Sequence, residues 1–325
     1  MTAVMPTPEQ LRHVVQAAGL APSVHNTQPW RFVARPERLE LHADPSRQLR
    51  VLDPDGRQLH MSCGAALFHA RVAARAIGLG VQVHLLPDLA QPAHLADLVL
   101  TAGQPATEAE VRLAAAILQR HTHRGPFDQQ DVPDAVLEVL RDAAQAEGSR
   151  LCQVVSEDQL VELEVMLSSA DAMEERDAGY RAELATWVHE GALRPDGIPA
   201  AAVTHSAGSS LRQRDFTLTN TAAVDGSAPA PDRPAVVVLT TDDDEPISWL
   251  RAGQALAAVL LRAADHGVQA QPLGQVTDIL AYRFGLRQAL GLAGMPQLVL
   301  RMGFAPRAAV TPRRSVDEVL VAVAD

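Results

Sequence analysis

Lysine is absent from this sequence, and all 28 basic residues are arginine. Without lysine the chain can form no Schiff base and has no lysine nucleophile, so arginine is the only permanent cation left to bind a phosphate. A GC-rich coding sequence would produce the same bias, and the chemical consequence holds either way. The two cysteines, Cys63 and Cys152, cannot build a disulfide framework, which agrees with a reducing compartment.

Long apolar runs and a net positive charge are also missing. No run approaches the roughly 18 to 20 apolar residues of a membrane-spanning helix, and the start MTAVMPTPEQLRHVV lacks the regions of a secretory signal. The formal net charge of -11 argues against a general nucleic-acid or anionic-membrane partner, because both attract a basic surface. We therefore expect a globular, cytoplasmic protein. Its core must consist mainly of Ala, Val and Leu, since aromatic residues make up only 3%.

Helical and strand patterns alternate along the chain. The apolar spacing of a helix occurs at 8–19, 57–79, 105–118, 134–147, 157–190, 246–266 and 275–291. Strand patterns occur at 31–34, 38–43, 81–87, 95–103, 150–155, 234–240 and 296–304. The segment 195–234 is rich in Gly, Pro, Ser and Ala without a sustained period, and a loop of that length is usually mobile or functional.

An internal repeat relates the long helices at 57–79 and 246–266. At a constant offset of 189 residues, Gly64, Ala66, Leu67, Ala74, Gly78 and Gln82 match Gly253, Ala255, Leu256, Ala263, Gly267 and Gln271. The strand LVLTAG at 98–103 likewise matches LVLRMG at 298–303. The order of elements predicts two related halves, roughly 1–105 and 106–325. The alternative is that two alanine-rich helices share a few alanines and a glycine by chance.

The two halves differ where function is expected. The loop APSVHNTQPW at 21–30 follows the first helix of the first half, whereas the matching place in the second half reads AEGSRLC. Conversely, RHTHR at 120–124 precedes only the second half, and TPRRS at 311–315 follows only its last strand. Such complementary differences are typical of one composite site shared between two fused, similar subunits.

The arginines of these segments predict a phosphate site. Arg120 and Arg124 are four residues apart, so both can lie on one side of a helical turn, and Arg313 and Arg314 add two more guanidinium groups. Bidentate guanidinium groups match a phosphate in geometry as well as charge. The alternative is surface pairing with some of the 39 acidic residues.

Uncharged groups in the other segments suit a planar, polar ligand. Ser23 and Asn26 lie in the first loop, and the main chain around Pro272 and Gly274 belongs to the segment HGVQAQPLGQ of the second half. A flat, hydrogen-bonding cofactor that carries a phosphate fits a site with arginines on one side and uncharged polar groups on the other.

The sequence gives little support for a metal site or for stable NAD binding. His121 and His123 are weak evidence for a metal because no third ligand lies nearby in the sequence. No GxGxxG follows a strand, so we do not expect stable NAD binding either.

These segments together resemble the nitroreductase superfamily of FMN flavoproteins. The sequence is similar to its single-chain, Acg-type branch, in which two nitroreductase-like halves are fused. The resemblance covers nearly the whole chain, through APSVHNTQPWRF, IGLG, RHTHRGPF, HGVQAQPLGQ and LRMGFAPRAAVTPRRS. It implies an α+β, nitroreductase-like fold with an intramolecular pseudo-dimer of two halves. A monomer is then plausible, and a homodimer remains open.

The resemblance also implies roles for particular residues. In the family an Arg-x-Ser-x-Arg element binds the flavin phosphate, and a basic residue after the last strand assists. The proline, serine and asparagine of the PSxxNxQPW loop reach the flavin from the other subunit, and a further stretch lies beside the isoalloxazine with a backbone N–H near N5. The corresponding residues here are Arg120, Thr122 (in place of Ser) and Arg124; Arg313 and Arg314; Pro22, Ser23 and Asn26; and Gln271, Pro272, Leu273 and Gly274.

Two departures from the family affect the expected function. The chain has motifs for only one flavin site, and in an Acg-type protein a segment such as 195–234 can act as a lid. The resemblance implies an FMN-dependent oxidoreductase that takes hydride from NAD(P)H and reduces a nitroaromatic, a quinone or a related small molecule, with no side-chain acid or base required. An FMN storage protein with a covered flavin is the main alternative, and a flavin-free relic of the fold is a third.

Overall fold

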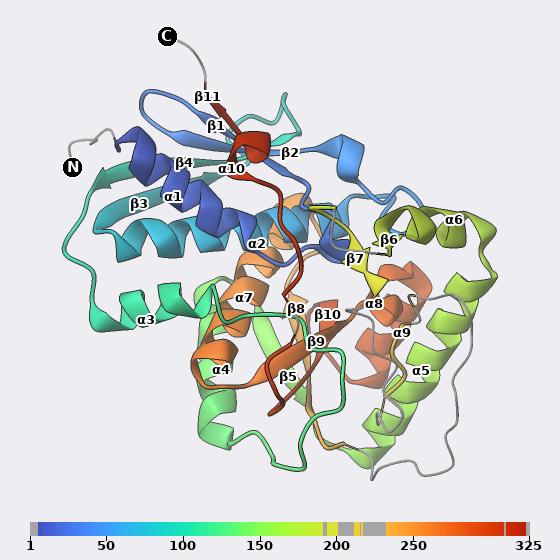
Figure 1. The fold of residues 1–325 in the computed structure, drawn as a ribbon. Helices are drawn as coiled ribbons and strands as arrows, with labels where there is room; N and C mark the ends of the chain where they lie inside the picture. The colour runs from blue at the N-terminus through green and yellow to red at the C-terminus, as the bar shows by residue number, and fades with distance from the viewer. Residues whose placement is uncertain are drawn as a thin grey trace.

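The computed structural model describes residues 6–190, 194–200, 211–214, 216, 232–308 and 310–322. The predicted lid at 195–234 therefore lies largely outside the described residues. Among these residues no helix is both long and apolar enough to span a membrane. In Figure 1 two sheets lie at opposite ends of the molecule, and the long helices α2 and α7 lie between them.

The first half contains one sheet and two main helices. Its elements are α1 (Pro8–Gly19), η1 (Val24–Asn26), β1 (Trp30–Ala34), β2 (Leu39–Ala43), η2 (Pro45–Arg47), α2 (Arg57–Ala76), β3 (Leu79–Leu85) and β4 (His94–Ala102). Helix α1 begins with a capping box between Thr7 and Gln10 and turns Val14, Val15 and Ala18 toward the core.

The second half has the same core elements and several additional ones. They are α3 (Glu108–Ala116), α4 (Asp134–Ala146), β5 (Arg150–Val154), α5 (Glu157–Arg176), α6 (Ala178–Trp187), β6 (Val188–His189), β7 (Ile198–Pro199), β8 (Ala235–Thr241), α7 (Pro246–Asp265), β9 (Gln269–Leu273), α8 (Gln275–Asp278), α9 (Leu280–Ala289), β10 (Met295–Gly303), α10 (Val316–Val319) and β11 (Leu320–Ala322). The predicted helix at 275–291 is thus two helices, because Ile279 has an extended backbone.

The two sheets share a strand order. The first sheet runs β11-β1-β2-β4-β3 and the second β5-β8-β10-β9, so the four strands of each half pair in the order first, second, fourth, third. All these pairs are antiparallel except β1 with β11. Strand β11 comes from the C-terminal segment, which crosses back to the first half and pairs Phe32 with Leu320. The segment carrying Arg313 and Arg314 therefore runs between the halves.

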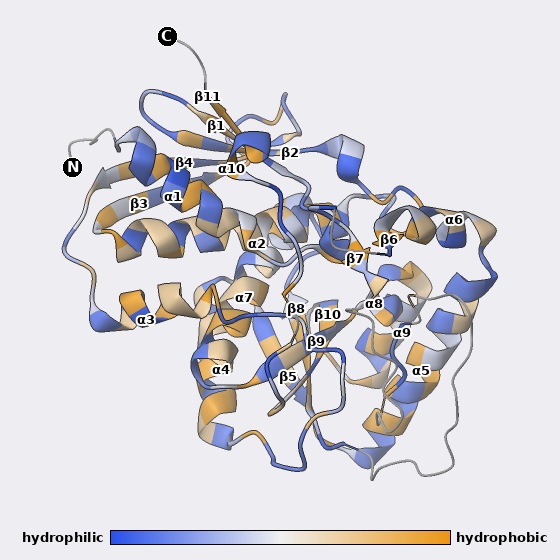
Figure 2. Ribbon diagram, viewed as in Figure 1, coloured by the Kyte–Doolittle hydropathy of each residue, from blue (hydrophilic) through white to orange (hydrophobic). Residues whose placement is uncertain are grey.

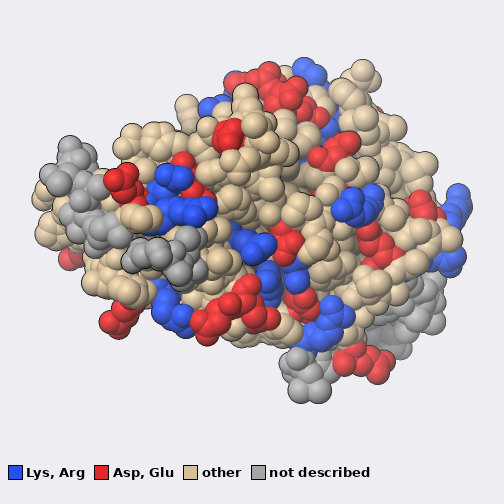
Figure 3. Space-filling view, turned by 90° about the horizontal axis from the view of Figure 1, so that it is seen from above, with Lys and Arg blue, Asp and Glu red and all other residues tan. Residues whose placement is uncertain are grey.

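The hydrophobic core consists of layers beside these sheets. One cluster joins the first sheet to α1 and α2, another joins α4 and α7 to one face of the second sheet, and a third joins α5 and α9 to its other face. Figure 2 shows hydrophobic and hydrophilic residues alternating along the outer helices α1, α4 and α5. On the face seen in Figure 3, arginine and acidic side chains are interspersed.

Candidate functional site

A cavity that is partly open to solvent lies between the two halves. The first half contributes residues 22–25 of the predicted loop and one face of α2. The second half contributes Thr122, Arg124, Gln271, Pro272, Gly274 and Gln275. Segments that the sequence singled out in different halves therefore meet at one cavity.

The loop at 21–28 has an unusual backbone. His25, Asn26 and Gln28 have φ values of 46°, 55° and 49°, in a region that residues other than glycine rarely occupy. Hydrogen bonds hold this shape: the Gln28 N–H donates to Oγ of Ser23 at 2.9 Å, and the Val24 N–H donates to Oγ of Ser62 at 3.2 Å. Backbone strain maintained by its surroundings is common at functional sites.

Asn26 holds the loop in place rather than lining the cavity. Its Nδ2 donates to the carbonyl of Gly197 at 3.0 Å and to that of Pro312 at 3.1 Å. Gln28 is used in the same way, since its Nε2 donates to the carbonyl of Pro195 at 2.8 Å and its Oε1 accepts from the Arg314 N–H at 2.8 Å. Pro22 and Ser23, by contrast, line the cavity.

The segment 120–124 lies beside β9. Thr122 forms an isolated parallel bridge with Ala270, and the His123 N–H donates to the Ala270 carbonyl at 3.0 Å. This pairing brings Thr122 next to Gln271, and both line the cavity. The Arg124 guanidinium also lines it and lies over the ring of Phe216 at 5.5 Å.

Arg120, which is buried, and Arg313, which is partly buried, form a cationic pair beside this segment. Arg120 is 5% exposed, and its Nη2 donates to the Leu20 carbonyl at 3.3 Å, while Nη1 of Arg313 donates to oxygens of Thr311 and Pro312. Burial and the neighbouring Arg313 charge lower the pKa of Arg120 to about 9, and burial lowers the pKa of Arg313 to about 10.

No carboxylate lies within ion-pair distance of Arg120 or Arg313 among the described residues, and the Nε atom of each lacks a hydrogen-bond partner there. Two buried like charges without a counter-charge are unfavourable. An anion bound between them would remove this unfavourable interaction. Arg314 is placed differently, because its guanidinium donates to the carbonyls of Gln28 and Glu318.

The predicted stretch 271–274 is divided between the cavity and the core. Gln271, Pro272 and Gly274 line the cavity, and Nε2 of Gln271 donates to Oε1 of Gln213 at 2.9 Å. Leu273 is 1% exposed and belongs to the hydrophobic cluster between the second sheet and α5. Its side chain therefore packs in the core, so only its backbone remains for a ligand.

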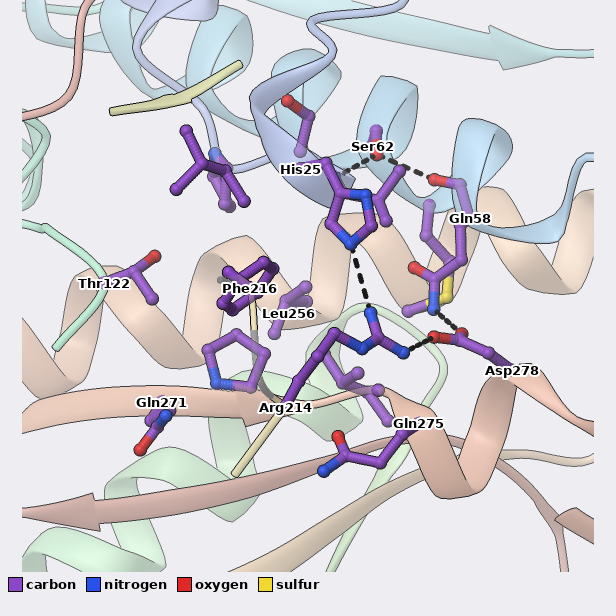
Figure 4. A pocket seen from close by; sticks show the side chains of 18 of the residues that line it. His25, Gln58, Ser62, Thr122, Arg214, Phe216, Leu256, Gln271, Gln275 and Asp278 are labelled. Carbon is purple, nitrogen blue, oxygen red and sulfur yellow. Dashed lines mark hydrogen bonds and ion pairs between the residues drawn. The ribbon is translucent and has the colours of Figure 1, made fainter. Parts of the chain in front are cut away.

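Arg214 is a cavity residue that no sequence motif indicated. Figure 4 shows its guanidinium between His25 and Asp278. Nη2 donates to Glu174 at 2.8 Å and to Asp278 at 2.9 Å, and Nη1 lies 3.2 Å from Nε2 of His25. Because arginine can only donate, His25 accepts through Nε2. Burial, with the charges of Arg214 and Arg124, lowers the pKa of His25 well below its usual value, so the imidazole is neutral.

Sequence reasoning also missed the cavity residues on helices. Gln58 and Ser62 lie one turn apart on α2, and Figure 4 shows both beside the loop residue His25. Nε2 of Gln58 donates to Oδ1 of Asp278 at 2.6 Å. Their four-residue spacing was the available signal, but it does not distinguish a cavity-facing polar pair from an exposed one.

Comparisons with known proteins bear on the family of the chain. The model of the nitroreductase family matches residues 2–50 and 117–304. Two Mycobacterium tuberculosis proteins, Rv3131 and acg, are each 35% identical to the chain over 98% of its length, which covers 93% and 97% of theirs. Their names assign NAD(P)H nitroreductase activity only provisionally. The match confirms the resemblance inferred from the sequence.

Solved structures are less similar to this chain than these two relatives are. Nitroreductases with bound FMN from Bacteroides fragilis and Desulfitobacterium hafniense are 13% and 14% identical to this chain, with TM-scores of 0.41 and 0.42. Each covers 66% of this chain and 98% of its own length. Scores at this level carry no argument about the site.

Proposed function

Because this chain belongs to the nitroreductase family, we propose that it binds FMN between its halves and uses it to pass hydride from NAD(P)H to a small acceptor. The acceptor class is a nitroaromatic, a quinone or a related small molecule. The observation that carries the proposal is the pair Arg120 and Arg313, which has no counter-charge among the described residues. Neither arginine lines the cavity, but Arg120 is two residues from Thr122, which does.

The residues present fit FMN. Arg120 and Arg313 would hold the phosphate, since each has a guanidinium edge unused by any described carboxylate. The ring would lie in the cavity against the backbone of 271–274 and residues 22 and 23 of the other half. Bound FMN supplies the redox chemistry, and the protein supplies position and electrostatics. Neutral His25 and the cationic Arg124 and Arg214 would then surround the ring with hydrogen-bond donors and positive charge.

The absorption spectrum of the purified protein tests FMN binding. We expect the bands of a bound flavin, present after purification or restored by added FMN, and their bleaching by NADH or NADPH without air. Return of the bands on addition of a quinone would complete the cycle. A protein that stays colourless after incubation with FMN contradicts the proposal.

The division of the site between the halves has its own test. Arg124→Ala removes a cavity residue of the second half, and Ser23→Ala removes one of the first half. We expect both variants to bind FMN more weakly than the wild type in a fluorescence titration. Arg112→Ala, an exposed arginine on α3, is the control and should bind as the wild type does. Unchanged affinity in both site variants would contradict a composite site.

A storage function is the second candidate, and Arg214 favours it. Arg214 and Phe216 line the cavity, and ion pairs to Glu174 and Asp278 fix Arg214 there. Side chains held in this way would hinder entry of a hydride donor. If FMN is stored, the bound flavin reacts slowly with NADPH in the wild type and faster in Arg214→Ala. Rapid bleaching in the wild type contradicts storage and supports turnover.

A further inference from the structure

A second group of polar side chains lies on the first sheet, away from the cavity. Glu40 and His42 belong to β2, and His94 and Asp97 belong to β4, the neighbouring strand in Figure 1. One ligand atom each from Glu40, His42 and His94 lies within 4.8 Å of the others. None of these residues lines the cavity.

The strand register explains why they meet. Glu40 and His42 are two residues apart, so both side chains project from the face opposite the core residues Leu39 and Leu41. On β4 the register pairs Glu40 with Asp97 but shifts by one residue before His42 pairs with His94. This irregularity brings His94 to the same face, although a regular strand would point it into the core. Such bulges often redirect a side chain toward a site.

The two oxygens of Glu40 have different partners. Oε1 accepts from Nε of Arg35 at 3.1 Å and from Nη2 of Arg38 at 2.6 Å, whereas Oε2 lies 3.0 Å from Nε2 of His42. Ligands of a tetrahedral zinc ion with bonds of about 2.0–2.1 Å are about 3.3 Å apart. A metal could therefore replace the proton between Oε2 and His42 while both arginines stay on Oε1.

Asp97 orients the second histidine. Nε2 of His94 lies 2.8 Å from Oδ1 of Asp97, so that nitrogen carries the proton and Nδ1 keeps its lone pair. A histidine that donates one ring N–H to a carboxylate and binds metal through the other nitrogen is the usual arrangement in zinc sites. The rings of His42 and His94 are stacked with centroids 4.5 Å apart and an interplanar angle of 14°, so one ring must rotate before in-plane lone pairs of both can reach one ion.

The burial and hydrogen bonding of the group suit a cation. Glu40 is 3% exposed, and its Oε1 accepts hydrogen bonds from Arg35 and Arg38, so these arginines hold the carboxylate in place. The competing charges, Arg35 and Arg38, have side chains 39% and 41% exposed, so solvent partly screens their charges while they remain on Oε1.

We propose that Glu40, His42 and His94 bind one Zn²⁺ ion on the outer face of the first sheet, with water as the fourth ligand. Two imidazoles and one carboxylate are a common zinc donor set. Asp97 holds His94 in the ligating orientation, and Arg35 and Arg38 hold Oε1 of Glu40. The site joins β2 to β4 through side chains, so metal binding would stabilise this sheet. The proposal does not depend on FMN.

Calorimetric titration of the chelator-treated, full-length protein with Zn²⁺ tests the site. We expect one ion per chain in the wild type, and at least a tenfold loss of affinity in His42→Gln and in His94→Gln. His13→Gln, an exposed histidine on α1, is the matched control and should bind as the wild type does. FMN content should be equal in all four proteins, which separates this result from any failure of the flavin proposal.

Two further measurements make the outcome decisive. Excess Zn²⁺ should raise the melting temperature of the wild type but not that of the double variant His42→Gln/His94→Gln. Co²⁺ should give tetrahedral ligand-field bands in the wild type alone, at wavelengths beyond the flavin absorption. Absence of Zn²⁺ binding in the wild type, or one-to-one binding retained after loss of either histidine, overturns the proposal.

Discussion

Gly64 of α2 and Gly253 of α7 face each other's helix where the two helices cross. A Cβ on Gly64 would lie 2.2 Å from the carbonyl oxygen of Leu250, and a Cβ on Gly253 would lie 2.0 Å from that of Met61. Met61 and Leu250 are separated by the same 189 residues as the two glycines. The contact is therefore reciprocal, as at the two-fold interface of a homodimer, although both helices belong to one chain.

This close crossing predicts the effect of a single methyl group. Gly64→Ala places Cβ against backbone, which cannot move without separating the helices, so we expect a loss of about 1–3 kcal/mol in the free energy of unfolding. Urea unfolding followed by circular dichroism measures it. Gly19→Ala is the control, since a Cβ there meets no heavy atom within 4 Å. Equal stability of the two variants would mean that the helices do not cross this closely.

Most helices and strands could be predicted from the sequence, because hydrophobic periodicity depends only on residues that are close together in the chain. Both long helices and every strand of the two main sheets except β9 and β11 were predicted within a few residues. The elements that were predicted wrongly depend on contacts between residues far apart in the sequence. Strand β11 is three residues long and is a strand only because it pairs with β1. The helix predicted over 275–291 breaks at Ile279, beside the buried Asp278 network, and periodicity carries no information about that network.

For the site, the sequence could indicate segments but not the direction of every side chain. Ser23, Thr122 and Gln271 lie in recognisable segments and line the cavity. Asn26 belongs to the same loop, but its left-handed backbone turns the amide toward Gly197 and Pro312. Arg214 lies in a segment without a motif, and its place depends on carboxylates from two helices. Such convergence becomes visible only in the folded chain.

The Arg120→Met variant should lose affinity for the phosphate of FMN without losing folding stability. Loss of charge-assisted hydrogen bonds worth about 1.5–3 kcal/mol would weaken FMN binding roughly 10- to 100-fold. Riboflavin, which lacks the phosphate, should bind equally to variant and wild type. Because the guanidinium is buried beside Arg313 without a described counter-charge, the flavin-free variant should be no less stable than the wild type.

Fluorescence titrations with FMN and riboflavin, together with urea unfolding, check these expectations for Arg120→Met. Arg12→Met, which removes an exposed arginine paired with Asp317, should leave both affinities unchanged. An equal loss of riboflavin and FMN affinity in Arg120→Met would show that Arg120 shapes the ring site and does not bind the phosphate.

Asn26 allows the backbone and the side chain of the loop to be tested separately. Asn26→Ala removes both hydrogen bonds and puts a poor residue at a φ of 55°, whereas Asn26→Gly removes the bonds but tolerates that backbone. We expect both to destabilise the protein and weaken FMN binding, with Ala worse than Gly by about 1 kcal/mol in urea unfolding. A glycine variant as unstable as the alanine variant would mean that the backbone conformation contributes nothing.

Asp53 predicts a pH dependence of stability. Its carboxylate accepts the N–H groups of Gln58 and Leu59, each at 2.9 Å, at the start of α2. Burial nevertheless raises its pKa to about 6, against these bonds and the charge of Arg57. The unfolded value is about 3.9, so between about pH 4 and pH 6 the folded state binds more protons than the unfolded state. Stability from this group is therefore greatest below pH 4 and falls as the pH rises to 6.

The variant Asp53→Asn isolates this effect, because an amide does not titrate. The free energy of unfolding of the wild type minus that of the variant should decrease by roughly 2–3 kcal/mol between pH 4 and pH 7, since each unit of pKa shift corresponds to about 1.4 kcal/mol. Urea unfolding of both proteins at the two pH values measures it, and other titrating groups cancel in the difference. A difference that is constant or increases with pH would mean that the bonds from Gln58 and Leu59 outweigh burial.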